Sequence, residues 1–416
     1  MSACRYTRST LPLLALLAAL PGREAPAQVA PPQGAAKPAQ KPPTGAAAAP
    51  AAASFDGLAR RAKAAQSAQK LDEAQDLYQK ALKLRPGWSE GRFALGTILY
   101  DLDRYAEARS EFRQVTVQQP KNGPSFAFLG MCEFQLKEHE QALAHLIQGR
   151  LLGLGGNATL KSVADYHTGI LLVRFGQYDS AREILSNFAL VDQDSPGVIE
   201  GLGLAALRMP YLPSELPADK REMVTMAGRA MFQITRSRYS PTARLAFDEL
   251  VTRFPEEPNA HYAKGVFLMT IEETPAAIAC FRRVLAMQPN HVSAMLQIAF
   301  QLIKEGRYEE ALPDAEKAVQ LEPGFFATHN ALGRVLLELG ETDRAIASLE
   351  KAAQLAPNSV QTWFALTRAY QKAGRPDDVK KARETFVKLD AALRAEREKT
   401  RGVAVPPSSL EPPSPE

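Results

Sequence analysis

The sequence predicts an all-α solenoid, in which short antiparallel helix pairs stack one after another along the chain. Prolines recur at intervals of 34 residues, at Pro86 and Pro120 and again at Pro255, Pro289, Pro323 and Pro357. A small residue stands twelve positions before each of these prolines, and a large apolar residue usually follows it four positions later. This spacing belongs to one helical face, so each period contains a helix that buries an apolar stripe against a neighbour.

Composition excludes several other classes of protein. Of the 416 residues, 45% are hydrophobic and 23% are charged, as in a soluble globular chain, and no apolar run of about 18 residues could span a bilayer. The net charge is only +4 and the cationic residues are interspersed, whereas a dedicated nucleic-acid binder needs a basic face. Three cysteines are too few for a scaffold held together by disulfides.

The first 27 residues have the order of a secretory signal peptide. Arg5 and Arg8 precede a short apolar run, Leu11 to Leu20, and Ala25-Pro26-Ala27 provides a small-residue cleavage site. Cys4 lies before the apolar run, so it is not the lipid-bearing cysteine of a bacterial lipoprotein. We therefore expect cleavage after Ala27 and an unanchored bacterial protein that is periplasmic or associated with the cell envelope.

Two terminal segments lack the residues that a core needs. Residues 28–53 contain six prolines, one valine and no aromatic residue, and residues 402–416 are similarly rich in proline. We expect a disordered linker in the first segment and a disordered tail in the second.

The features of the 34-residue period have physical reasons. Helices of about 12–14 residues are too short to be stable alone in water, so two of them must pack closely. A Gly or Ala on the first helix, as at Gly96 and Gly333, is expected to face the Ala of the second helix. Proline then ends the second helix, because it lacks an N–H and disfavours helical geometry in the residue before it.

This pattern resembles the tetratricopeptide repeat, in which W-x2-L-G-x2-Y opens the first helix, A-x3-F lies in the second and Pro ends it. Trp363, Leu366 and Tyr370 give the fullest copy of the first half, with Thr367 in place of Gly. The resemblance covers about 340 residues and implies a right-handed superhelix, whose first helices line a concave groove for an extended peptide or a partner's helix. The repeat frames begin at Phe55, Ser89, Gly123, Ser162, Val224, Pro258, Val292, Phe326 and Val360.

Two interruptions divide the predicted array. The third frame replaces its proline with the loop 151–160, and Pro210 and Pro213 break a helix before the next good frame at Val224. We therefore expect an N-terminal array over 54–195, a divergent helical unit over 196–223 and a C-terminal array over 224–401. The last helix, about 377–401, should be a cap with a polar outer face and an inward stripe of Val379, Ala382, Phe386, Leu389 and Leu393.

The resemblance also places positions 2, 5, 9 and 12 of each frame in the groove. The notable residues there are aromatic side chains and arginines, which are frequent at binding hot spots, and one asparagine. The predicted partner-binding residues are Phe93, Tyr100, Phe134, Tyr166, Tyr262, Phe300, Asn330, Arg334, Phe364 and Arg368. For each aromatic residue, the alternative is that it packs between repeats.

Arg334 and Arg368 give the sharpest local prediction. They stand 34 residues apart at position 9 of adjacent frames, and together they can hold an acidic segment or a terminal carboxylate. The subtype of the family that binds chaperone tails has Lys and Asn at positions 5 and 9 of its first repeat. This chain has Ala59 and Lys63 there, so we do not expect that ligand.

The remaining motifs carry little chemistry. Gly201, Gly203 and Ala206 fit the loose nucleotide pattern G-x-G-x-x-A, but no strand pattern surrounds them, and small residues at a helix crossing explain them better. None of the six histidines forms a metal-binding pair such as H-x-x-x-H. Cys132 and Cys280 lie four units apart and should remain free thiols, while Asn157-Ala158-Thr159 has the spacing of a glycosylation site.

We therefore expect a non-enzymatic scaffold, without cofactor or metal, that binds a protein or peptide partner in its groove during envelope assembly or secretion. The ligand and the oligomeric state are left open by these residues. Recognition of polysaccharide by groove aromatics is the alternative within binding, and an enzyme is the third class. No nucleic-acid partner, transmembrane segment or lipid anchor is expected.

Overall fold

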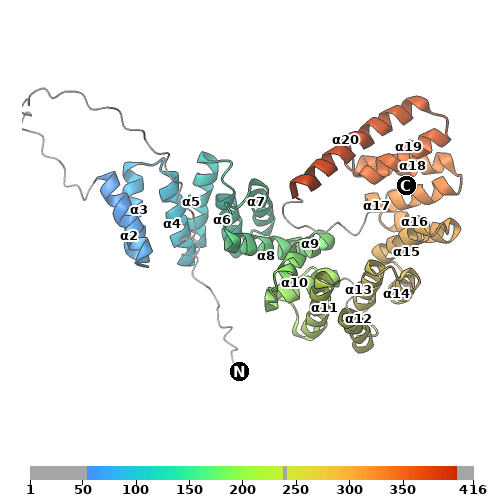
Figure 1. The fold of residues 1–416 in the computed structure, drawn as a ribbon, viewed down its shortest axis with the longest axis horizontal. Coiled ribbons are helices and arrows are strands. Elements are labelled where there is room, and N and C mark those ends of the chain that lie inside the picture. Colours follow the sequence, from blue (N-terminus) through green and yellow to red (C-terminus); the bar gives the residue numbers. More distant parts are fainter. Residues whose placement is uncertain (1–53, 238–240, 401–416) are drawn as a thin grey trace, which may run out of the picture. The chain divides into compact units, whose positions relative to one another are not determined.

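The computed structural model describes residues 54–237 and 241–400. Across these residues every regular element is a helix and no strand occurs, which confirms the predicted fold class. The predicted signal peptide, linker and tail (1–27, 28–53 and 402–416) lie outside the described residues. The described helices fall into two compact units, 54–171 and 172–400, and the boundary lies inside one helix (Figure 1). The division into arrays at 196–223 rests on repeat register and remains a prediction.

The first unit contains three helix pairs joined by short turns, and each of these six helices packs most closely on its partner within the pair. Its helices are α2 (Phe55–Ser67), α3 (Leu71–Leu84), α4 (Ser89–Asp101), α5 (Tyr105–Gln118), α6 (Gly123–Gln135), α7 (His139–Leu152) and α8 (Ala158–Arg174), of which α8 crosses the boundary between the units.

The second unit continues the pairs but contains one additional helix, α10. Its elements are α9 (Tyr178–Leu190), α10 (Pro196–Ala206), the 3-10 turn η2 (Pro213–Glu215), α11 (Ala218–Arg236), α12 (Pro241–Arg253), α13 (Pro258–Thr270), α14 (Thr274–Met287), α15 (Val292–Lys304), α16 (Tyr308–Leu321), α17 (Phe326–Glu338), α18 (Thr342–Leu355), α19 (Val360–Lys372) and α20 (Pro376–Thr400). Helix α10 packs most closely on α11 and less closely on α9, and α11 also packs on α12.

Seven of the nine predicted first helices begin at the predicted residue. The other two begin early. The fourth starts at Ala158 rather than at Ser162, because the Asn157 side chain accepts a hydrogen bond from the Leu160 N–H at 2.9 Å and caps the helix. The fifth, α11, starts at Ala218, directly after a proline, six residues ahead of its frame.

The repeat prolines end the second helices as predicted. Helices α3, α5, α14, α16 and α18 each stop two residues before the proline of their period. The intervening residue leaves the helical region, as at Arg85, where φ is −137° and ψ is 84°. This is the restriction that a proline imposes on the residue before it.

The packing within the pairs agrees in part with the prediction: a Cβ on Gly130 would lie 2.8 Å from the carbonyl oxygen of Ala142, the predicted partner. The small and large residues of the second helix are buried as expected, for example Ala108 and Phe112. However, a Cβ on Gly96 would lie 2.9 Å from the Phe112 ring, so the glycine makes room for the large residue rather than for the alanine. Gly333 faces both residues, since a Cβ there would lie 2.5 Å from Leu349 Cγ and 3.2 Å from the Ala345 carbonyl oxygen. The glycine is therefore needed because a side chain from the partner helix fills its place.

The cap helix α20 is longer than its partner, and its predicted inward stripe is only partly buried. Ala382 is fully buried and Phe386 and Leu389 are half-buried, whereas Leu393 is 38% exposed. The inward placement of Leu393 is therefore wrong. Since α19 has 13 residues and α20 has 25, the second half of α20 extends past the surface that α19 provides.

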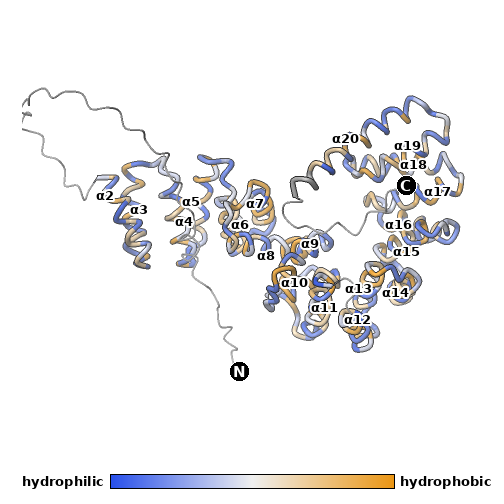
Figure 2. Tube along the Cα trace, in the orientation of Figure 1, coloured by the Kyte–Doolittle hydropathy of each residue, from blue (hydrophilic) through white to orange (hydrophobic). Residues whose placement is uncertain are grey.

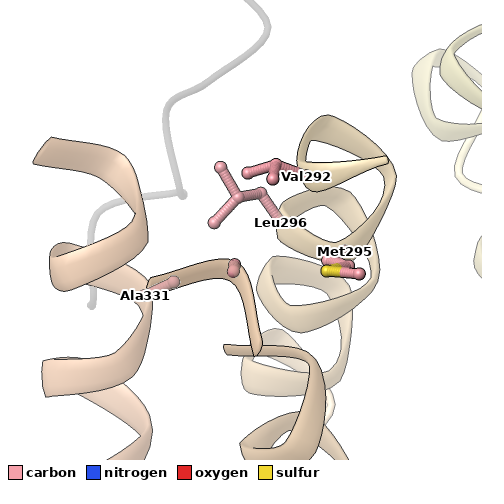
Figure 3. Packing of buried hydrophobic residues seen from close by; sticks show 5 residues of the cluster. Val292, Met295, Leu296 and Ala331 are labelled. Carbon is pink, nitrogen blue, oxygen red and sulfur yellow. The ribbon is translucent and has the colours of Figure 1, made fainter. Parts of the chain in front are cut away.

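Hydrophilic and hydrophobic residues alternate along the helices (Figure 2), and the buried residues of the described helices are mostly apolar. One buried cluster joins α15 to the helices that follow it and contains Val292, Met295, Leu296, Ala318 and Ala331 (Figure 3). Phe300, one turn further along α15, is partly buried against this cluster. A continuous apolar core thus connects successive repeats and fixes the first helices side by side.

The extra helix α10 meets α11 at unusually close range. A Cβ on Gly203 would lie 1.9 Å from the Val224 carbonyl oxygen, and one on Gly228 would lie 1.9 Å from the Ile199 carbonyl oxygen. Gly201 and Gly203 lie in the middle of α10, in surroundings without a strand among the described residues. Gly203 therefore serves a helix crossing, as expected, and the nucleotide pattern lacks the strand that it requires among the described residues.

Candidate partner-binding surface

Three neighbouring first helices of the second unit present the largest group of predicted binding residues. Helices α15, α17 and α19 pack side by side, each backed by its own second helix. Phe300 comes from α15, Arg334 and Glu338 from α17, and Phe364 and Arg368 from α19. We call these five residues the arginine face.

Arg334 is the most enclosed cation of the arginine face. Its guanidinium carbon lies 5.8 Å from the centre of the Phe300 ring, within range of a cation–π interaction. Burial lowers the pKa of Arg334, and the charge of Arg368 lowers it further, while Glu338 acts in the opposite direction. Among the described residues no hydrogen bond or ion pair holds its guanidinium, so its donors are available to an incoming acceptor.

Arg368 is more exposed and is shared with a carboxylate. Its Nη1 lies 2.7 Å from Oε1 of Glu338, and 45% of its side chain is accessible. One turn further along α19, Lys372 Nζ donates a hydrogen bond to the Leu337 carbonyl at 2.8 Å. Arg334 and Arg368 both interact with Glu338, so two arginines share one carboxylate and this part of the surface has an excess of positive charge.

Phe364 supplies the exposed apolar part of the arginine face. It is 48% exposed, and its ring centre lies 5.6 Å from that of Phe386 on α20. This contact joins the arginine face to the cap helix, which packs on α19. An exposed aromatic ring next to two arginines is a combination typical of binding hot spots.

Two predicted residues of this unit are buried within the fold. Asn330 is 2% exposed and donates from Nδ2 to the Thr362 hydroxyl at 2.9 Å, which joins α17 to α19. Tyr262 is 3% exposed and its ring packs beside those of Phe281 and His291. In this structure both side chains position their neighbours.

The predicted aromatic residues of the first unit are half-buried against other rings. Phe93 lies edge-on to Phe112 and Phe128, with centres 5.5 and 5.4 Å away. Tyr100 lies 5.2 Å from the Tyr105 ring, and burial raises its pKa. For this pair the structure shows the alternative that the sequence left open, packing between repeats.

The other two aromatic residues of the first unit gather around a histidine. The ring of His167 lies 4.7 Å from Phe134 and 5.4 Å from Tyr166. His167 Nδ1 donates to the Val163 carbonyl at 2.8 Å, and burial lowers its pKa. The neutral ring therefore belongs to an apolar cluster on the first helices.

Sequence reasoning missed a basic residue that covers part of the predicted groove. Arg208, in the segment after α10, lies over the rings of Tyr178 and Tyr262, with its guanidinium 4.8 and 5.4 Å from their centres. It also lies 3.6 Å from Asp179 and has a positive φ of 51°. The only available signal was the pair of prolines that breaks the array at this point, and it does not reveal a contact with α13.

Other chemical groups are sparse in the described part of the chain. Glu133 is a fully buried carboxylate whose Oε2 lies 2.6 Å from His145 Nδ1. The thiols of Cys132 and Cys280 are both unbridged, the first buried and the second half-buried. Over residues 54–237 and 241–400, no group of three or more His, Cys, Asp or Glu side chains is arranged to hold a metal ion. None of the described helices has the length and apolarity that a membrane span requires.

Comparison with known proteins supports the repeat assignment. A family model described as tetratricopeptide repeat matches residues 59–125 and 93–149. A second model, the middle TPR-like domain of cilia and flagella-associated protein 70, matches residues 230–390. The two models together reach into both compact units.

Individual relatives are distant. The human protein O-mannosyl-transferase TMTC3 is 23% identical in an alignment of 236 residues that covers 54% of this chain, and the chain spans about a quarter of that protein's length. Among solved structures, MamA from Desulfovibrio magneticus RS-1 is 23% identical, covers 43% of this chain and 97% of its own, and has a TM-score of 0.36. A double mutant of MamA from RS-1 is 22% identical, covers 44% and 98%, and has a TM-score of 0.37.

Proposed function

The chain is a tetratricopeptide-repeat protein, and from this premise we propose that it is a non-enzymatic scaffold that binds an acidic peptide segment of a partner protein on its arginine face. Solenoids of such repeats provide extended surfaces for protein interaction and are generally not catalytic. The observation that carries the proposal is Arg334, which lies over Phe300 and whose guanidinium has no hydrogen-bond or ion-pair partner among residues 54–237 and 241–400; the neighbouring helix α19 adds the exposed Phe364.

The two arginines should contribute unequally to affinity. Arg334 is partly desolvated and free to bind a carboxylate, so its contact falls in the range of hydrogen bonds to charged groups. Arg368 is exposed and already shared with Glu338, so its contact is worth less. Together we expect a contribution of about 2 kcal/mol, or about a 30-fold change in Kd.

A direct test measures the Kd of short fluorescein-labelled peptides that contain Leu, Pro and Glu. A matched set of control peptides has Lys in place of each Glu. The acidic peptides should bind, and Arg334→Ala/Arg368→Ala should weaken them about 30-fold and reduce the salt dependence of binding. The control variant, Arg283→Ala/Arg344→Ala, removes the same charge from the second helices α14 and α18. Equal losses in both variants, or no loss in either, would remove the arginine face from the proposal.

Peptide binding is favoured over recognition of polysaccharide by the burial of the predicted aromatic residues. A sugar ring stacks on the open face of an aromatic side chain. Of the seven aromatic residues predicted for the groove, only Phe364 is classed as exposed, and the others are buried or half-buried. Titration with glycan fragments gives the opposing test, because glycan binding without peptide binding would reverse this choice.

The location of the protein completes the proposal. We propose export to the periplasm or cell envelope of a bacterium, supported by the order of basic, apolar and small residues over 1–27. A role there in assembly or secretion of envelope components follows from location and binding together. Cell fractionation and the mass of the mature N-terminus test it, and a mature chain that retains residues 1–27 in the cytoplasm would contradict it.

A further inference from the structure

The cap helix extends the second unit beside the arginine face. Helices α19 and α20 are joined by the three-residue turn 373–375, so they run antiparallel. Because α20 is longer by twelve residues, it projects past the start of α19 at Val360 by about 18 Å. The contact of Phe386 with Phe364 keeps the middle of α20 next to the face.

The residues that follow α20 have a composition opposite in charge to the arginine face. Residues 402–416 contain Glu411 and Glu416 and no Lys or Arg. Five prolines favour an extended polyproline conformation, which loses little entropy when it binds. Leu410 is the one large apolar residue near these carboxylates, directly before Glu411.

We infer that residues 402–416 dock on the arginine face of their own chain, with Glu411 held by Arg334 and Arg368 and Leu410 against Phe364. This inference rests on the proposed function, because the tail would occupy the site that an acidic partner needs. A partner then binds only by displacing the tail.

The length of the segment fits this assignment. Arg368 lies eight residues into α19, so the distance from the end of α20 back to Arg368 is about 30 Å along the helices. Gly402 allows the chain to reverse direction immediately after the helix. Residues 403–411 then span about 28 Å in a polyproline conformation, which brings Glu411 to the arginines.

The N-terminal linker is the less suitable occupant. Its only charged residues over 28–53 are Lys37 and Lys41, which the arginines would repel. A second copy of the tail, supplied by another chain, has the same chemistry, so the experiment must separate docking within one chain from docking between chains.

The test uses a fluorescein-labelled peptide of residues 402–416 and two forms of the full chain, the wild type and Glu411→Lys/Glu416→Lys. A tail tethered next to its site reaches an effective concentration of about 1 mM, so it should compete strongly with added peptide in the wild type. For a peptide Kd of about 0.1 mM, we expect about tenfold tighter binding to the variant than to the wild type. Adding Arg368→Ala to the variant should weaken this binding, whereas Arg344→Ala should leave it unchanged.

Three outcomes would overturn the inference. Equal affinity of the peptide for wild type and variant would mean that the tail does not occupy the face. A wild-type dimer that dissociates in the Glu411→Lys/Glu416→Lys variant would assign the tail to a second copy. The 402–416 peptide could also fail to bind the Glu411→Lys/Glu416→Lys variant while the unrelated acidic peptides still bind it. That result would reject the tail as the occupant of the arginine face and leave the proposed function standing. If the unrelated peptides also fail, the proposed function falls with it.

Discussion

Substitution of Gly203 by alanine tests the closest helix crossing in the second unit. The added Cβ would lie 1.9 Å from the Val224 carbonyl oxygen, whereas real Cβ atoms essentially never come closer than 3.0 Å to another heavy atom. Helices α10 and α11 would therefore have to separate by at least about 1.1 Å. The obstacle is backbone, which cannot rotate aside as a side chain can.

The expected magnitude follows from two opposing effects. Forcing an additional methyl group into a packed crossing costs about 1–3 kcal/mol, and the backbone obstacle places this site at the upper end. Alanine regains up to about 1 kcal/mol over glycine in a helix interior. We expect the free energy needed to separate α10 from α11 to fall by about 2 kcal/mol. This is equivalent to about a 30-fold increase in the population of the state in which the two helices are apart.

Hydrogen exchange followed by mass spectrometry measures this loss where it occurs. Peptides from 196–206 should exchange about 30-fold faster in Gly203→Ala than in the wild type. This holds in the EX2 regime, where the exchange rate is proportional to the equilibrium population of the open state. The matched control is Gly87→Ala, because a Cβ at Gly87 meets nothing within 4 Å. The double variant Gly203→Ala/Gly228→Ala should lose less stability than the two single variants lose in sum, since one separation of the helices relieves both clashes.

The result that refutes this reasoning is specific. If Gly203→Ala exchanges as slowly as the wild type or more slowly, the helices do not cross at the spacing described, and the gain in helix propensity is the only effect of the substitution.

Three further predictions follow from single side chains. The pKa of His167 is lowered by burial, so the stability that it contributes is complete above its ordinary pKa of 6.5 and is lost as pH falls below it. The free energy of unfolding of the first unit, followed through Trp88 fluorescence, should therefore fall by at most about 1.4 kcal/mol per pH unit in this range, and His167→Phe should remove this dependence. An unchanged slope in the variant would contradict the assignment. Asn157→Ala should cost about 1 kcal/mol at the start of α8 and speed proteolysis there, whereas Asn157→Asp keeps the cap; equal effects of the two would reject the capping role. Asn330→Ala should destabilise the second unit by about 1–2 kcal/mol in urea, and a loss of acidic-peptide binding without that destabilisation would show instead that Asn330 contacts the partner.

The repeat could be predicted because its determinants are local. A proline, an alanine twelve residues earlier and a large residue between them each act on a helix within the same 34-residue period, so spacing alone locates the pairs. Ser89 and Phe326 begin their helices at the predicted residues for this reason. The departures at Ala158 and Ala218 come from a helix cap and a preceding proline, which act outside the repeat pattern.

The details of the binding surface depend on contacts that the period does not specify. Arg208 covers Tyr262 across 54 residues of chain, and its segment has no repeat register that would predict a neighbour. Glu338 pairs with Arg368 from the adjacent repeat at position 13, one place beyond the positions used to define the groove. Position within a frame therefore identified candidate side chains but not which of them remain accessible.

The location of Arg208 sets a limit on the size of any ligand that binds the first helices of the second unit. Since Arg208 already lies over Tyr262 on α13, the open part of this surface begins at α15 and ends at α19. Helices pack about 9 Å apart, so three of them offer a track of roughly 27 Å. An extended chain advances about 3.3 Å per residue, and the footprint is therefore about eight residues, the length of a linear motif rather than of a folded domain.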